Sequence, residues 1–170
     1  AGCVQIPDDA AISLRINLKQ TLAPVSTAAP TKLADNTDGT TSWLLEDTGT
    51  DRIFLYSGDY VMAELDSGNG TSIPFYYSKK YRSRLENGAL ELMEKAIQYC
   101  TEHYGAKSDA DSAFQILQTT AFNFGGFAVS NISGMGESFF SDENLNDSDK
   151  GPGSAEVLAH EIIHQWWGLS

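Results

Sequence analysis

The sequence has 170 residues, of which 41% are hydrophobic and 20% are charged, as in an ordinary soluble globular protein with room for a core. Eleven Lys and Arg residues against 23 Asp and Glu residues give a formal net charge of -12, which argues against nucleic acid or an anionic membrane surface as a partner. No apolar run approaches the roughly 20 residues that span a bilayer, and the N-terminal residues lack the pattern of an intact signal peptide.

The first 50 residues contain one clear strand signal. Ala11–Lys19 alternates apolar and polar residues strictly, which predicts a half-buried β-strand. Residues 20–42 are rich in Thr, Ala, Pro, Asp and Gly, and this composition predicts a long loop or linker. Cys3 and Cys100 fit no metal motif; we expect a free thiol near the N-terminus and a buried thiol in the core, with a disulfide between them as the alternative.

Short strand-like segments separated by turn residues follow this region and predict an antiparallel sheet. Because Pro has no backbone N–H, we expect Pro74 at a sheet edge or a bulge. The predicted strands are Trp43–Glu46, Arg52–Tyr56, Asp59–Leu65 and Ser72–Ser78.

The second half of the sequence adds helices to this sheet. Apolar residues recur every three or four positions from Arg84 to Tyr104, which predicts an amphipathic helix that ends at Gly105. Ala113–Phe122 is a predicted strand, and a Gly-rich loop and another strand should run to about Phe140. A polar loop over residues 141–154 should lead to a last helix with Ser154 as its N-cap, which completes an α+β fold.

A possible metal site lies on this last helix, in the segment HEIIHQWWG. Residues four apart share one face of a helix, so the side chains of His160 and His164 project together and can bind one metal ion. Glu161 lies beside them on the flank of the same face. This is the HExxH arrangement, in which the two histidines are Zn²⁺ ligands and the glutamate is the general base.

The segment VLAHEIIHQWWG resembles the active-site helix of the aminopeptidase N family of zinc peptidases (gluzincins), with Trp166, Trp167 and Gly168 extending the match beyond HExxH. The order of strands and helices over residues 52–170 also resembles the first half of the family's thermolysin-like catalytic domain. The resemblance therefore implies a zinc-dependent, aminopeptidase-like hydrolase that acts on peptides. It implies a catalytic part over residues 51–170, and the tail of a preceding β-domain and a linker over residues 1–50.

The family carries a G-x-M-E-N segment that lies along the substrate, and its Glu holds the free amino terminus. The nearest match is Gly134, Met135, Gly136 and Glu137, which implies a substrate-binding role for these four residues. Gly136 and Ser138 depart from the family pattern, which leaves a zinc endopeptidase as an alternative to an exopeptidase. The rival segment Gly125–Phe127 lacks the acid.

A catalytic zinc ion needs three protein ligands, and the motif supplies two. In the family the third is a Glu on the next helix, about 20 residues beyond the motif, and an oxyanion-stabilising Tyr also lies downstream. Both lie beyond Ser170, so we interpret the chain as an inactive fragment of a larger enzyme. The upstream candidates lack the spacing of a known site; they are His103, Glu137, Asp142, Glu143, Asp147 and Asp149.

Two further expectations follow from this interpretation. Without downstream helices, the last helix should expose an apolar patch and favour self-association; its residues are Ile162, Ile163, Trp166, Trp167 and Leu169. The acidic, Thr- and Ser-rich surface and the family resemblance indicate an extracellular or cell-surface setting, with any membrane attachment outside this chain. A non-catalytic, peptidase-like binding ectodomain is the alternative from another functional class.

Overall fold

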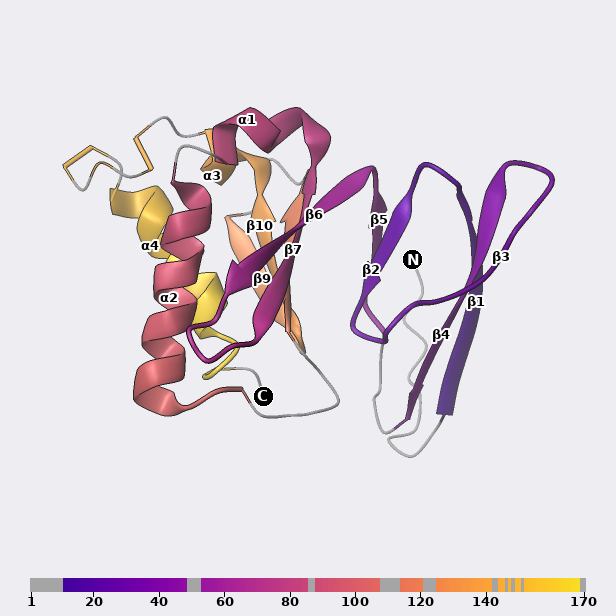
Figure 1. Cartoon of the computed structure of the whole chain (residues 1–170), viewed down its shortest axis with the longest axis horizontal. Coiled ribbons are helices and arrows are strands. Elements are labelled where there is room, and N and C mark those ends of the chain that lie inside the picture. The colour runs from indigo at the N-terminus through magenta and orange to yellow at the C-terminus, as the bar shows by residue number, and fades with distance from the viewer. Residues whose placement is uncertain are drawn as a thin grey trace. The chain divides into compact units, whose positions relative to one another are not determined.

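The computed structural model of the chain describes residues 11–48, 53–85, 88–107, 114–120, 125–141, 144–145, 147, 149–150 and 152–168. Over these residues the chain is an α+β protein with ten strands in three sheets, as the sequence predicts for the fold class (Figure 1). Its internal contacts divide it into two compact units, Ala1–Tyr60 and Val61–Ser170. None of the described helices is long and apolar enough to cross a bilayer.

The first unit contains two small antiparallel sheets. The strand predicted over Ala11–Lys19 is confirmed as β1, which pairs along its full length with β4 (Thr40–Thr48). β3 (Thr31–Asp35) pairs with the other side of β4, and β2 (Ala23–Ser26) pairs with β5 (Leu55–Gly58).

The prediction of a long loop over residues 20–42 is therefore wrong. β3 is exposed along its whole length, so it shows no alternation of buried and exposed residues that a sequence pattern would reveal. Side-chain hydrogen bonds support this hairpin instead: Thr41 Oγ1 donates to Asp35 Oδ1 at 2.6 Å, and Asn36 Nδ2 donates to Thr40 Oγ1 at 2.9 Å.

The second unit is built on a five-stranded sheet in the order β6-β7-β8-β10-β9. β8 runs parallel to both β7 and β10, whereas β9 is antiparallel to β10, so this sheet is mixed and the predicted antiparallel pairing holds for only part of it. The helices between β7 and β8 return the chain to the same end of the sheet, which makes these neighbouring strands parallel. The strands are β6 (Tyr60–Asp66), β7 (Ser72–Ser78), β8 (Gln115–Thr119), β9 (Gly126–Val129) and β10 (Ile132–Gly136).

Some strand boundaries agree closely with the prediction. β7 covers the predicted residues, although Pro74 lies in an interior strand rather than at the sheet edge. The last predicted strand ends at Gly136 instead of near Phe140, because α3 (Glu137–Ser141) begins there.

The predicted helix from Arg84 to Tyr104 is shorter in the structure. A 3-10 turn η1 (Lys79–Tyr81) and α1 (Arg82–Leu85) come first, and α2 (Ala89–Tyr104) starts after Gly88, whose φ of 98° lies in the left-handed region. α4 (Pro152–Ile163) begins at Pro152, a residue type that suits the first turn of a helix. Ser154 therefore lies inside α4 and is not its N-cap, contrary to the prediction.

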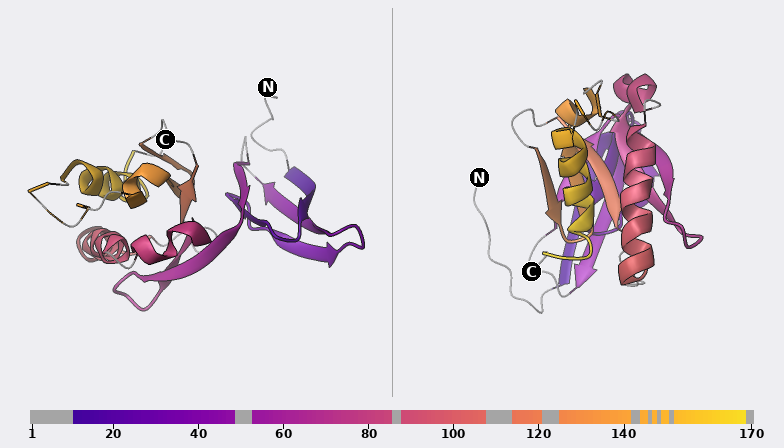
Figure 2. Two further views of the ribbon diagram at one scale, coloured as in Figure 1. Left: turned by 90° about the horizontal axis from the view of Figure 1, so that it is seen from above. Right: turned by 90° about the vertical axis from the view of Figure 1, so that its left-hand side faces the viewer.

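α2 and α4 lie side by side and pack on one face of the five-stranded sheet (Figures 1 and 2). The space between these helices and the sheet is the main hydrophobic core of the unit. Its fully buried members include Leu65, Phe75, Met93, Ile97, Ile116, Met135, Leu158 and Ile162. Cys100, on α2, is a buried free thiol, as predicted for that residue. Cys3 lies outside the described residues.

We expect Met93→Ala to lower the free energy of unfolding by about 2–5 kcal/mol, because it leaves a cavity at a position with 0% exposure. Urea denaturation followed by circular dichroism measures this loss. Met62→Ala is the matched control, since Met62 is 51% exposed and should change stability by less than about 0.5 kcal/mol. Equal losses for the two variants would contradict this packing.

Candidate metal centre

His160 in the last turn of α4 and His164, one residue beyond its end, lie together on one face, and His164 N still donates to the carbonyl of His160. Their ring centroids are 4.5 Å apart, and the ring planes are nearly perpendicular at 84°. His160 is exposed and His164 is half-buried, so the pair is open to solvent. The structure thus places the two predicted zinc ligands side by side.

The end of the HEIIHQWWG segment orients the ring of His164. The chain turns back after α4, and the Nδ1 atom of His164 lies 3.1 Å from the carbonyl oxygen of Trp167. A carbonyl only accepts hydrogen bonds, so in the neutral ring Nδ1 carries the proton and Nε2 has the lone pair. Gly168 permits this turn: its φ is +82°, and a Cβ there would lie 2.9 Å from Nδ1 of His164.

Glu161 lies between α4 and the edge strand β9. Its side chain is 8% exposed and rests on Gly126, where an added Cβ would come within 2.3 Å of Glu161 Cγ and 2.9 Å of Oε1. Burial raises the pKa of the Glu161 carboxyl above its ordinary value, and the nearby His160 and His164 act in the opposite direction. The carboxyl group predicted as the general base is therefore beside the two imidazoles in a poorly solvated place.

The two tryptophans of the motif have different surroundings. Trp166 is half-buried; its Nε1 donates to the carbonyl of Gly105 at 2.9 Å, and its ring meets that of Phe114 edge to face. Trp167 is 45% exposed and lies edge-on to Tyr104, with 4.0 Å between centroids. Trp166 therefore ties the end of α4 to the end of α2.

The predicted apolar patch on the last helix is smaller than expected. Ile162 is fully buried in the core, and Ile163 and Trp166 are half-buried. Trp167 is exposed, and Leu169 lies outside the described residues. Self-association through this helix stays a prediction, with Trp167 as its exposed ring.

The segment predicted to bind substrate lies in the interior strand β10 and at the start of α3. Met135 is fully buried and belongs to the core, and Glu137 is 8% exposed. The ring of Phe127 covers Gly134, since an added Cβ there would lie 2.1 Å from that ring. Gly136 is also buried. All four residues of this segment are thus buried rather than at an open surface.

The rival segment Gly125–Phe127 runs directly beside the predicted one. Gly126 is opposite Met135 and Phe127 is opposite Gly134, and Gly136 N donates to the carbonyl of Gly125 at 3.2 Å. β9, which contains most of this segment, is the edge strand of the sheet. The position that faces Glu161 therefore belongs to the rival segment.

A third metal ligand is not found among the described residues. No group of three His, Cys, Asp or Glu side chains gathers there. His103 lies on α2, where its Nδ1 is 2.9 Å from the carbonyl of Tyr99. Asp142 and Glu143 lie outside the residues that the structure describes. Within the described chain, the donor set fits two of the ligands that a catalytic zinc ion requires.

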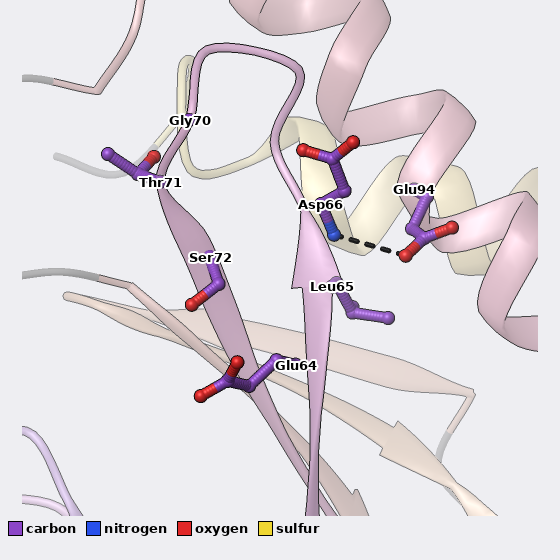
Figure 3. Close-up of a pocket in the computed structure, with 7 residues that line it drawn as sticks. All are labelled: Glu64, Leu65, Asp66, Gly70, Thr71, Ser72 and Glu94. Atoms are coloured by element: carbon purple, nitrogen blue, oxygen red, sulfur yellow. Dashed lines mark hydrogen bonds between the residues drawn. The ribbon is translucent and has the colours of Figure 1, made fainter.

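A separate open pocket of about 430 Å³ lies at the hairpin between β6 and β7 (Figure 3). Glu94 of α2 accepts a hydrogen bond from the backbone N of Asp66 there, at 3.1 Å. The pocket contains none of the predicted site residues. Its lining residues are Glu64, Leu65, Asp66, Gly70, Thr71, Ser72 and Glu94.

Sequence reasoning did not identify the roles of two buried polar residues, Ser133 of β10 and Gln165 within the motif itself. Ser133 precedes Glu161 by 28 residues, and no spacing rule connects them. A Gln that follows the second histidine has no metal-binding chemistry of its own. The one available signal was Ser133, a polar residue in a strand whose other residues are apolar or glycine.

Comparison of the chain with protein-family models gives no match, and comparison with curated proteins gives none either. The resemblance to aminopeptidase N therefore rests on the motif and on the order of the elements.

We expect Gly126→Ala to displace the Glu161 side chain and to lower the free energy of unfolding by about 1–3 kcal/mol, because the added Cβ overlaps that side chain. Gly153→Ala is the matched control. Position 153 lies in α4 with nothing within 4 Å of an added Cβ, so alanine there should be neutral or stabilise by up to about 1 kcal/mol. Thermal unfolding of both variants measures the difference, and similar stabilities would show that Glu161 does not rest on Gly126.

We also expect neutral His164 to carry its proton on Nδ1, because that nitrogen donates to the carbonyl of Trp167. Long-range ¹H–¹⁵N NMR correlations at a pH where the ring is neutral distinguish the two tautomers. A proton on Nε2 would rule out this hydrogen bond.

Proposed function

We propose that this chain carries the metal-binding helix of a zinc-dependent peptidase, aminopeptidase-like as its motif suggests, within the N-terminal half of a thermolysin-like domain. The observation that carries the proposal is the single turn of α4 that presents His160 and His164 together and holds Glu161 beside them. In such a site, bound Zn²⁺ lowers the pKa of a coordinated water and polarises the scissile carbonyl.

The chain's own groups suit this role. His164 presents Nε2 to a metal while Trp167 holds its Nδ1 proton, the arrangement in which a carbonyl fixes the tautomer of a ligating histidine. Glu161 takes a proton from water and later returns it to the leaving amine.

The neighbouring edge strand supports a peptide as substrate. Among the described strands, β9 pairs with β10 on one side and lies at the end of the sheet, a position that suits an extended peptide that adds by backbone hydrogen bonds. Gly126 of this strand is in contact with Glu161. The carboxyl group and the peptide-binding edge are thus adjacent.

A zinc endopeptidase is the alternative that the structure favours on one point. β9 has the sequence Gly-Phe-Ala-Val and therefore offers no carboxylate to hold a free amino terminus. Glu137, the predicted residue for that role, is buried at the start of α3. A search for cleavage therefore needs both kinds of peptide.

We expect the chain to bind Zn²⁺ weakly in a calorimetric titration, and His160→Ala or His164→Ala to weaken this binding by at least about tenfold, since each removes a direct ligand. His103→Ala is the matched control, because His103 lies on α2 with its Nδ1 at Tyr99. Equal Zn²⁺ affinity for the parent, His160→Ala and His164→Ala chains would refute the proposed site.

The same samples should be assayed with aminoacyl anilides and with internally quenched peptides blocked at both ends. We expect no turnover of either, because the described residues supply two ligands. Turnover that disappears in Glu161→Gln would place a third ligand elsewhere in this chain, and the substrate cleaved would distinguish an exopeptidase from an endopeptidase.

A further inference from the structure

The backbone hydrogen-bond pattern changes where α4 ends. His164 N donates to the carbonyl of His160, the regular helical spacing of four. Gln165 N then donates to the carbonyl of Ile162, a spacing of three. The amide that would ordinarily reach the carbonyl of Glu161 is therefore used elsewhere. A buried carbonyl in this position needs another donor.

Ser133 supplies that donor from the neighbouring strand β10. Its Oγ donates to the carbonyl of Glu161 at 2.6 Å, and Ser133 has 0% exposure. Ser133 Oγ in turn accepts a hydrogen bond from Nε2 of Gln165 at 3.1 Å. Lys107 Nζ donates to Oε1 of the same amide at 2.9 Å, which fixes the orientation of the Gln165 side chain.

The donors and acceptors in this series of hydrogen bonds can be assigned in only one way. Lys107 can only donate, so it occupies the amide oxygen of Gln165 and directs the NH₂ group to Ser133. A carbonyl only accepts, so the hydroxyl of Ser133 gives its single proton to Glu161 and accepts from Gln165 with one of its lone pairs. Hydrogen bonds in such a chain polarise and strengthen one another inside a protein.

The carbonyl that receives the bond belongs to the residue between the two predicted ligands. A bond there anchors the turn from His160 to His164 to the interior of the sheet. The Glu161 side chain rests on the adjacent strand β9. The backbone and the carboxyl group of one residue are thus set by two neighbouring strands.

We propose that Ser133 and Gln165 are positioning residues, which hold the metal-binding turn of α4 in register with the sheet. The role toward a metal rests on the proposed function; the anchoring of the turn does not.

Two measurements test the proposal on the full chain. The first is hydrogen–deuterium exchange of the amides of residues 160–167 without metal. The second is competitive binding of Co²⁺, whose visible absorption reports the geometry of the site. The variants are Ser133→Ala, Ser133→Thr, which keeps the hydroxyl, and Gln165→Glu, whose carboxylate accepts the Ser133 proton instead of donating. Ser67→Ala is the matched control, since the 3% exposed Ser67 also bonds a carbonyl at 2.6 Å, that of Thr71 at the β6–β7 turn.

We expect Ser133→Ala and Gln165→Glu to speed exchange in the turn about tenfold or more while exchange in α2 is unchanged, and to weaken Co²⁺ binding about tenfold. Ser133→Thr should restore both values, and Ser67→Ala should alter neither. Parent-like exchange in the turn of Ser133→Ala would overturn the proposal. Faster exchange with parent-like Co²⁺ affinity and spectrum would overturn its metal-positioning part.

A different result would refute the proposed function. A parent chain that binds Co²⁺ no better than His160→Ala would refute the metal site, and the exchange measurement, which uses no metal, would still decide whether Ser133 and Gln165 hold the turn.

Discussion

Glu161 is fixed at both ends, and the candidate site depends on this constraint. Its backbone carbonyl is bonded to Ser133 of the interior strand, and its side chain rests on Gly126 of the edge strand. Because those two strands are neighbours, α4 has little freedom to rotate or slide over the sheet. Fixing Glu161 also fixes the backbone that carries His160 and His164. The position of the two imidazoles therefore depends on the sheet as well as on the helix.

The parts of the fold that were predictable are those with a local pattern. Strict alternation located β1, and turn residues on either side located β7. The exposed strand β3 has no such pattern, because its partner strand and polar hydrogen bonds hold it rather than burial of alternate residues. Parallel pairing of β7, β8 and β10 depends on where the chain returns after its helices, which no short window of sequence records.

The site divides in the same way. The spacing of His160 and His164 follows from helical periodicity, so the pair and the adjacent Glu161 were readable from the sequence. Two glycine-containing segments were candidates for the predicted substrate-binding segment, and the sequence favoured the one that contains an acid. The structure puts that segment in the interior and Gly126 at the edge. Edge position is a property of the assembled sheet, as is the contact of Ser133 with the helix, and neither has a sequence pattern.

The turn that ends at Gly168 bears on how such sites are recognised in other sequences. The glycine lets the carbonyl of Trp167 return to His164 and hold its Nδ1 proton. The last residues of the motif therefore orient the second histidine. A five-residue HExxH pattern discards this information, whereas a nine-residue pattern that ends in glycine keeps it. In this chain, the glycine four residues after the second histidine is what allows the backbone to orient that ring.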